Sequence, residues 1–315
     1  MLDGFSATIE VHEDWKSLVD LDWNLTISEQ GELKPKTRTN KNWPWLQTQS
    51  FTKRTTVFGY QVELIETITT DARNGTTATK NRLNIKGSFH KAFHGGRNVA
   101  PFNYQQQHEA ITQLCHHLHL EPCKVKLNTL EIGVNLPVPF APLPFLDKKL
   151  LMFKNSAFTK YRPDTTGLQI GYVCDKSDYS VKIYDKGLQF GLSEHLLRFE
   201  VKFHKMRKLN RVYEISTFAD LLNKEKVFAL KSLIIEAWSD VLLFEVNMEA
   251  KGITSRQKRF LEVAQYPEYW NRLRRENPQK FRDKRKQFFS ITDKFGTGES
   301  MEVMELIHEV WASLF

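Results

Sequence analysis

The stretch TTGLQIGYVCDKSDYSVKIYDKGLQFGLSEHLLRFEVKFHKM, residues 165–206, decides the fold. It holds two runs in which apolar and polar residues alternate, the pattern of a strand with one buried face. The apolar positions are Val181, Ile183, Leu197, Phe199, Val201 and Phe203. The alternate positions are Lys182, Tyr184, Lys186, Arg198, Glu200, Lys202 and His204. We therefore expect two neighbouring strands with one core face and one face that carries reactive side chains.

The polar face is suited to attack on a phosphodiester. A tyrosine hydroxyl is a weak nucleophile at its free pKa near 10, so nearby positive charge must favour the phenolate. Lys182 and Lys186 lie two positions either side of Tyr184, and Arg198 would hold a phosphate oxygen. Tyr179 is the rival nucleophile, because an irregular strand would turn it to this face. The alternative interpretation is the ordinary solvent face of an antiparallel sheet.

A third alternating run, KLNTLEIGVNLPV at residues 126–138, supplies carboxylate chemistry. Its polar positions include Glu131 and Asn135. Carboxylate oxygens are the ligands that Mg²⁺ and Mn²⁺ prefer. We predict that Glu131 and Glu200 hold one of these ions beside Tyr184, with the three strands in one sheet.

The composition predicts a soluble globular protein. The chain has 315 residues, 41% of them hydrophobic, which is enough for a sizeable core. No run approaches eighteen apolar residues, and the first residues lack an apolar signal core, so we expect no membrane insertion and a cytoplasmic location. The three cysteines form no C-x-x-C pair, which favours reduced thiols.

The positive charge is concentrated near the C-terminus. Residues 251–286 hold twelve basic and four acidic side chains, which accounts for the whole net charge of +8. Such a segment can follow a polyanion, and we expect it to bind DNA. The candidate DNA-binding residues are Lys182, Arg272, Arg274, Arg275, Lys284 and Arg285. The alternative is the solvated face of ordinary helices.

The loop GELKPKTRTNKNWPW, residues 31–45, places basic residues beside Trp43 and Trp45. Basic groups beside exposed indoles can hold a phosphate backbone and stack on a base. The two indoles could equally pack around Pro44 and close the core. Both interpretations stay open at this point.

The rest of the pattern predicts an α+β fold: an antiparallel β-sheet with flanking helices, followed by a helical C-terminal region. Residues 56–69 and 80–87 alternate like a hairpin, with Asn74-Gly75 as the turn signal. Helices are expected at 105–120, 217–246, 255–264, 268–276, 279–290 and 299–315. We predict a catalytic nicking and joining domain over 1–216 and a helical, basic region over 217–315.

The motif GYVCDKSDYSVKIYDKG followed by LLRFEVKFHK resembles the corresponding motifs of rolling-circle replication initiators of plasmids and filamentous phages. Residues 85–102, IKGSFHKAFHGGRNVAPF, and 129–136, TLEIGVNL, are similar to two further blocks of that family. The tail from Tyr266 resembles its helical end. The chain departs from the family pattern where Glu131 and Asn135 replace two aspartates and Thr129 replaces an arginine. Glu131 can still bind a metal, but Asn135 lowers the charge of the ligand set.

The resemblance implies a tyrosine that nicks one DNA strand, leaving a 5′-phosphotyrosyl link and a free 3′-hydroxyl, and later rejoins the ends. It implies Tyr184 as nucleophile, Lys186 as its partner, and Glu131 with Glu200 at the metal. Single-stranded or supercoiled origin DNA would be the partner, and homodimers and a host helicase are compatible with it. The alternatives are a conjugative relaxase or single-strand transposase, and a non-catalytic DNA-binding replication or copy-control protein.

Overall fold

The computed structural model describes residues 2–25, 36–39, 42–163 and 167–315. The chain forms two compact units, one of residues 1–131 with 203–229 and one of residues 132–202 with 230–315. Strand β7 (Lys126–Pro137) passes from the first unit into the second. The predicted boundary between a catalytic and a C-terminal domain at 216/217 stays a prediction.

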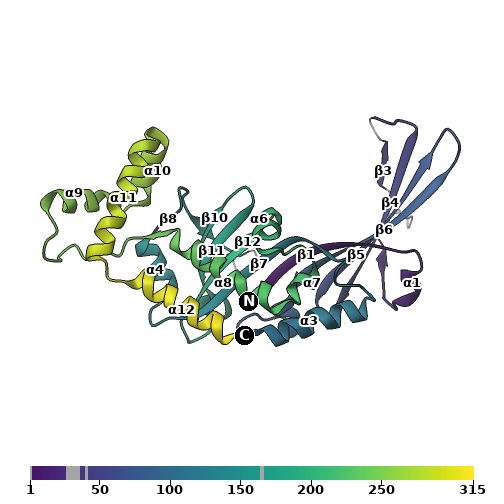
Figure 1. Ribbon diagram of the computed structural model, residues 1–315, viewed down its shortest axis with the longest axis horizontal. Helices are drawn as coiled ribbons and strands as arrows, with labels where there is room; N and C mark the ends of the chain where they lie inside the picture. Colours follow the sequence, from purple (N-terminus) through teal and green to yellow (C-terminus); the bar gives the residue numbers. More distant parts are fainter. Residues whose placement is uncertain (1, 26–35, 40–41, 164–166) are drawn as a thin grey trace. The chain divides into compact units, whose positions relative to one another are not determined.

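The first unit is built on a sheet of long antiparallel strands (Figure 1). Its strands are β1 (Leu2–Val11), β2 (Asn24–Leu25), β3 (Lys36–Thr39), β4 (Leu46–Val57), β5 (Tyr60–Asp71) and β6 (Thr77–Ser88). The order is β2-β4-β5-β6-β1-β7, and β3 also pairs with β4. Asn74-Gly75 lies in the β5–β6 connection, with Gly75 at φ +73°, as the turn signal predicted.

One face of this sheet forms the core of the first unit. Phe5, Ala7 and Ile9 alternate on β1 and are buried, because helices α2 (Phe89–Phe93) and α3 (Tyr104–His117) cover that face. The ring of Phe5 stacks on Phe89 with centroids 4.0 Å apart. The unit also contains three short helices, α1 (Trp15–Leu18), α6 (Arg207–Tyr213) and α7 (Phe218–Leu221), and the start of the longer α8 (Lys224–Ser239).

The second unit carries the strands that the sequence analysis singled out. They are β9 (Thr159–Tyr161), β10 (Gly171–Asp175), β11 (Tyr179–Asp185) and β12 (Leu196–Phe203), in the order β7-β12-β11-β10-β9. Strand β10 pairs antiparallel with both β9 and β11. A separate pair joins β8 (Leu150–Phe153) and β13 (Val241–Leu243). Helices α4 (Pro142–Lys149) and α5 (Lys186–Phe190) lie in the connections.

The C-terminal helices are α9 (Ser255–Ala264), α10 (Pro267–Glu276), α11 (Pro278–Phe295) and α12 (Glu299–Ser313). Within the second unit, α9, α10 and α11 share a hydrophobic core with β8 and β13. The indole of Trp270 is fully buried, donates to the Ala264 carbonyl at 2.7 Å, and lies edge-on to Phe281 and Phe288. Since each helix alone buries only one stripe, this aromatic cluster holds α9, α10 and α11 together.

The predicted fold class is confirmed, and two local predictions are wrong. Residues 56–69 are not one strand, because β4 ends at Val57 and turns through Phe58 and Gly59, both at positive φ. A phenylalanine is not a usual turn residue, so the pattern missed this hairpin. The expected helix over 217–246 is interrupted, since α8 ends at Ser239 and β13 follows. None of the described helices has the length and apolar character needed to cross a membrane.

Candidate functional site

Tyr184 is positioned by the pairing of three strands. In the registers of β9, β10 and β11, Tyr161 lies opposite Gly171, and Gly171 lies opposite Tyr184. A Cβ at position 171 would come within 2.3 Å of the Ile183 carbonyl oxygen and 2.4 Å of the Tyr184 Cβ, so only glycine fits. The ring of Tyr161 reaches across this gap to 5.3 Å from the ring of Tyr184. The tyrosine is therefore held between its own strand and an aromatic cover.

The hydroxyl of Tyr184 lies inside a cluster of charged side chains. It donates a hydrogen bond to Glu200 at 3.3 Å and accepts one from the Lys186 ammonium at 3.4 Å. Glu200 also accepts from Lys182 and from the Arg198 Nε, both at 2.8 Å. The spacing of the two strands thus brings together the tyrosine, three cations and one carboxylate that the alternation had placed on one face.

The charges of this cluster fix the ionisation of Glu200. Burial opposes ionisation, but the positive charges of Lys182 and Arg198 and their hydrogen bonds lower the pKa of Glu200 to about 2. The carboxylate is therefore negative at neutral pH. Because both of its oxygens already accept strong hydrogen bonds, it is better suited to holding cations in place than to removing a proton.

The expected open reactive face is a buried polar layer. Tyr184 is only 3% exposed, and Lys186, Arg198 and Glu200 are buried beside it. The apolar neighbours Val181 and Ile183 are also fully buried, so both faces of β11 are covered. A buried charge is stable only when it is paired and hydrogen-bonded, which this network provides. The hydroxyl of Tyr184 is therefore closed to solvent unless its cover moves.

Asn135 orients Arg198 within the second unit. Its side-chain oxygen accepts from the arginine Nη1 at 3.0 Å, and Asn135 is itself buried. Gly133, on the same strand, leaves room for the cluster, because a Cβ there would come within 2.7 Å of the Glu200 Cβ. The asparagine that replaces an acid of the family pattern therefore supports the arginine.

Asp3 and Glu131 are carboxylates of the first unit whose oxygen atoms lie within 4.8 Å of each other, and they could contribute to a metal site. The predicted pairing of Glu131 with Glu200 stays a prediction. Asp3 is buried and accepts from Asn98 at 2.6 Å and from Ser88, both within the block that resembles the family. Glu131 lies against Gly4, where an added Cβ would be 3.5 Å from its carboxylate. Oxygen donors of this kind fit Mg²⁺ or Mn²⁺. The sequence analysis did not identify Asp3, because the pattern of its strand is an alternation of the apolar residues Phe5, Ala7 and Ile9, which does not indicate a metal ligand.

Tyr179 lies apart from this cluster. It begins β11, is partly buried, and packs edge-on against Phe153 with ring centroids 6.2 Å apart. Its hydroxyl is a hydrogen-bond partner of Lys154. Tyr179 precedes the paired register of residues 180–184 with β10, and its role as the rival nucleophile stays a prediction.

Of the predicted DNA-binding residues, Lys182 pairs with Glu200 in the Tyr184 cluster, and the others lie on α10, on α11 and in the first unit. Arg272, Arg274 and Arg275 are exposed on α10. Lys284 and Arg285 on α11 stack their cations over the rings of Phe260 and Phe289, at 4.7 and 5.0 Å from the centroids. In the first unit, Trp43 is 52% exposed, and Trp45 is covered by the guanidinium of Arg73 at 4.5 Å. Trp43 is thus available for stacking, whereas Trp45 is already stacked.

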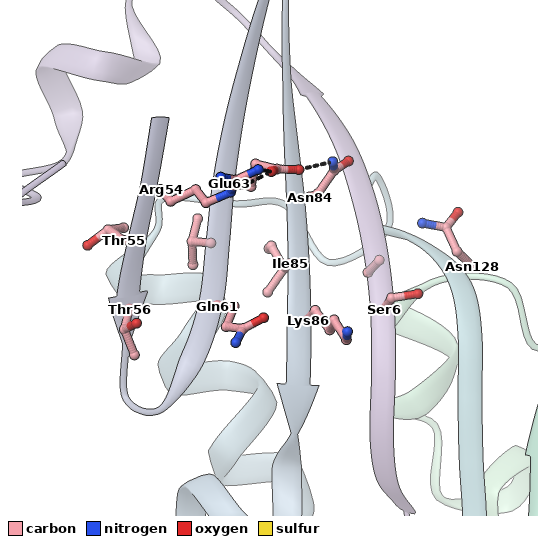
Figure 2. Close-up of a pocket in the computed structure, with 12 residues that line it drawn as sticks. Ser6, Arg54, Thr55, Thr56, Gln61, Glu63, Asn84, Ile85, Lys86 and Asn128 are labelled. Atoms are coloured by element: carbon pink, nitrogen blue, oxygen red, sulfur yellow. Dashed lines mark hydrogen bonds and ion pairs between the residues drawn. The ribbon is translucent and has the colours of Figure 1, made fainter. Parts of the chain in front are cut away.

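A polar cavity of about 610 Å³ lies on the sheet of the first unit (Figure 2). Amide and hydroxyl side chains line it, including Gln61, Asn84 and Asn128. The guanidinium of Arg54 pairs with Glu63 at 2.9 Å, and Asn84 also donates to Glu63. This pair neutralises Arg54, and the remaining lining combines the cation of Lys86 with amide and hydroxyl groups suited to hydrogen bonding.

Comparison with known proteins gives one similar fold. No family model matches the chain, and no curated protein matches it. A rolling circle replication initiator protein from Geobacillus stearothermophilus has a similar structure, with 15% sequence identity and a TM-score of 0.37. The match covers 84% of this chain and 96% of that one.

Proposed function

We propose that this chain initiates rolling-circle replication by nicking and rejoining origin DNA with Tyr184. The observation that carries the proposal is the position of the Tyr184 hydroxyl between the Lys186 ammonium and Glu200, with Arg198 on the same carboxylate. A cation at hydrogen-bond distance from the hydroxyl favours the phenolate, which is the nucleophilic form. The sequence motif from Gly171 to Phe203 supports the same assignment.

In the proposed reaction, the phenolic oxygen of Tyr184 attacks the phosphorus of one backbone phosphate. The phosphorus–O3′ bond breaks, a 5′-phosphotyrosyl bond forms, and the released 3′-oxygen takes up a proton to give a free 3′-hydroxyl. The phenol gives its proton to solvent, and Lys186 stabilises the resulting negative charge. Joining is the reverse, because attack by a 3′-hydroxyl on the phosphotyrosine restores the phosphodiester and the phenol.

Arg198 and Lys182 would stabilise charge on the phosphate oxygens once the substrate displaces part of the network around Glu200. The sequence resemblance implies Glu131 with Glu200 at Mg²⁺ or Mn²⁺, an ion that would neutralise charge on the phosphate, and Asp3 lies beside Glu131 in the first unit. The ring of Tyr161 must move before DNA reaches the hydroxyl. Binding of the strand and opening of the site are therefore coupled.

The test is covalent capture. The protein is incubated with Mn²⁺ and labelled DNA that contains the coding region of this chain and the sequence on either side of it. Supercoiled and single-stranded forms of this DNA are both used. We expect a labelled band that survives a denaturing gel with the wild type and with Tyr179→Phe, and no such band with Tyr184→Phe. A band that persists in Tyr184→Phe and vanishes in Tyr179→Phe would transfer the nucleophile to Tyr179. DNA binding without any adduct would favour the non-catalytic alternative.

A conjugative relaxase or a single-strand transposase would use the same covalent step. A plasmid replication assay separates these functions, because only an initiator sustains replication of a plasmid that carries its nick site. We expect replication with the wild type and none with Tyr184→Phe.

A further inference from the structure

A second cavity, of about 630 Å³, lies within the second unit beside α10 and α11. It is lined by four basic side chains, Lys154, Arg274, Arg282 and Arg285, and by one acidic side chain, Asp240. Their formal net charge is +3. The acid is already used, because Asp240 pairs with Lys154 at 3.1 Å.

Helix geometry makes this a shaped site rather than a general basic surface. Pro278, Phe281, Arg282 and Arg285 have the i, i+3, i+4, i+7 spacing that places side chains on one face of α11. Arg274, from the last turn of α10, reaches the same cavity. Three guanidinium groups from two helices therefore converge, and the first turn of α11, where the helix dipole is positive, lies with them.

Asp240 is the acid of the cavity wall, and its ion pair is with Lys154 rather than with an arginine. Across the described ranges of the chain, Arg274, Arg282 and Arg285 form no ion pair. Arg282 donates only to the neutral Gln279. The Nε of Arg285 is buried and, within the same ranges, has no hydrogen-bond acceptor. A buried donor without an acceptor is rare, and a ligand oxygen would satisfy it.

The electrostatics agree with this geometry. Burial lowers the pKa of Arg285, and Asp240 only partly opposes that effect. Burial, together with the charges of Arg274 and Lys154, also lowers the pKa of the nearby Lys176. The positive potential of the cavity thus extends to side chains beyond its wall.

We propose that this cavity binds one backbone phosphate of a DNA strand, at a position separate from the phosphate that Tyr184 attacks. The inference rests on the proposed function, which makes DNA the substrate. Guanidinium groups recognise phosphate by paired hydrogen bonds, and three of them suit its oxygens. A polymer fits better than a small anion because Arg274 and Arg282 are exposed at the rim, and the surrounding segment 251–286 is basic.

The test measures DNA affinity without chemistry. Fluorescence anisotropy of a labelled single-stranded oligonucleotide is followed in EDTA over a series of salt concentrations. We expect Arg282→Gln/Arg285→Gln to bind at least tenfold more weakly, and the slope of log K against log salt to fall by about 0.7 for the lost phosphate contact. The control Lys280→Gln/Lys286→Gln removes the same charge from exposed positions of α11 outside the cavity, and should stay within twofold of the wild type.

Equal losses in the two double variants would overturn the proposal, because the effect would then be that of a diffuse field. Unchanged DNA affinity with loss of inorganic phosphate binding, measured by ³¹P NMR, would overturn it in favour of a small anion. If Arg285 is needed for folding, the single variant Arg282→Gln, at an exposed position, replaces the double variant. Its slope of log K against log salt should fall by the same amount, because the same phosphate contact is lost. An absent covalent adduct with this affinity difference intact would sink only the Tyr184 proposal.

Discussion

The second unit holds two groups of basic side chains that differ in how their charges are balanced. Around Tyr184, the cations Lys182 and Arg198 share the buried carboxylate of Glu200. Around Arg285, three guanidinium groups converge with no carboxylate of their own in the described residues. The first group is bridged by a buried carboxylate and closed, and the second is open, with the acid of its wall paired to Lys154. Paired charges fix a reactive group in place, whereas unpaired charges attract a ligand.

The largest effect is expected from the loss of Arg198, the central arginine of the group around Tyr184. Arg198→Met leaves Glu200 short of a cation and Asn135 without its donor, so we expect a loss of about 3–5 kcal/mol in the free energy of unfolding. Urea denaturation measures this loss. Arg282→Met, in the open cavity, should change the same free energy by less than about 0.5 kcal/mol. Equal losses at the two positions would refute the distinction.

The second prediction concerns acid stability. The pKa of Glu200 is lowered from 4.5 to about 2, so its contribution is complete above pH 4.5 and is lost as the pH falls toward 2. This contribution is on the order of 3 kcal/mol. Unfolding free energies measured between pH 6 and pH 2 should fall less steeply for Glu200→Gln than for the wild type. The matched open-cavity variant Arg285→Gln should keep the wild-type slope, and parallel curves for all three proteins would count against the role of Glu200.

Replacement of Lys186 separates an electrostatic effect of its ammonium on Tyr184 from a role in packing. Lys186→Met keeps the length of the side chain but removes the ammonium at 3.4 Å from the Tyr184 hydroxyl. We expect covalent attachment to slow by about 10²-fold and its rise with pH to move to higher pH, since the phenolate loses its cation. Single-turnover adduct formation over a pH series measures both effects. A slower rate with an unshifted pH profile would assign Lys186 to packing alone.

The smallest expected effect is in the open cavity. Its like charges repel one another, and salt screens that repulsion. Added salt should therefore stabilise the wild type more than Arg282→Gln/Arg285→Gln, by a few tenths of a kcal/mol. Thermal unfolding at low and high salt would measure the difference. An identical salt response would mean that the two arginines are already compensated.

The sequence predicted the strands of the Tyr184 cluster because each has a strict alternation with one apolar side. Strands β11 and β12 lie where Val181, Ile183 and Leu197 indicated, and α9 spans the predicted 255–264. The alternation could not tell that the polar side is also covered. That covering depends on Tyr161 of β9, and a three-residue strand carries no periodic signal.

The open cavity shows a different limit of sequence reasoning. The charge count of 251–286 identified a basic region, and Arg274 and Arg285 were among the predicted DNA-binding residues. Lys154 and Asp240 were not, because they come from distant parts of the chain and meet α11 only in the folded unit. Spacing along a helix predicts one wall of a cavity, and tertiary packing supplies the others.

Gly171 has a consequence for the accuracy with which the tyrosine is placed. If β10 slid by one residue along β11, the side chain of Ile170 or Tyr172 would stand opposite Tyr184, where even one carbon atom collides. Because it lacks a side chain, Gly171 thus fixes the register between β10 and β11. The position of Tyr184 along the direction of the strand is therefore fixed.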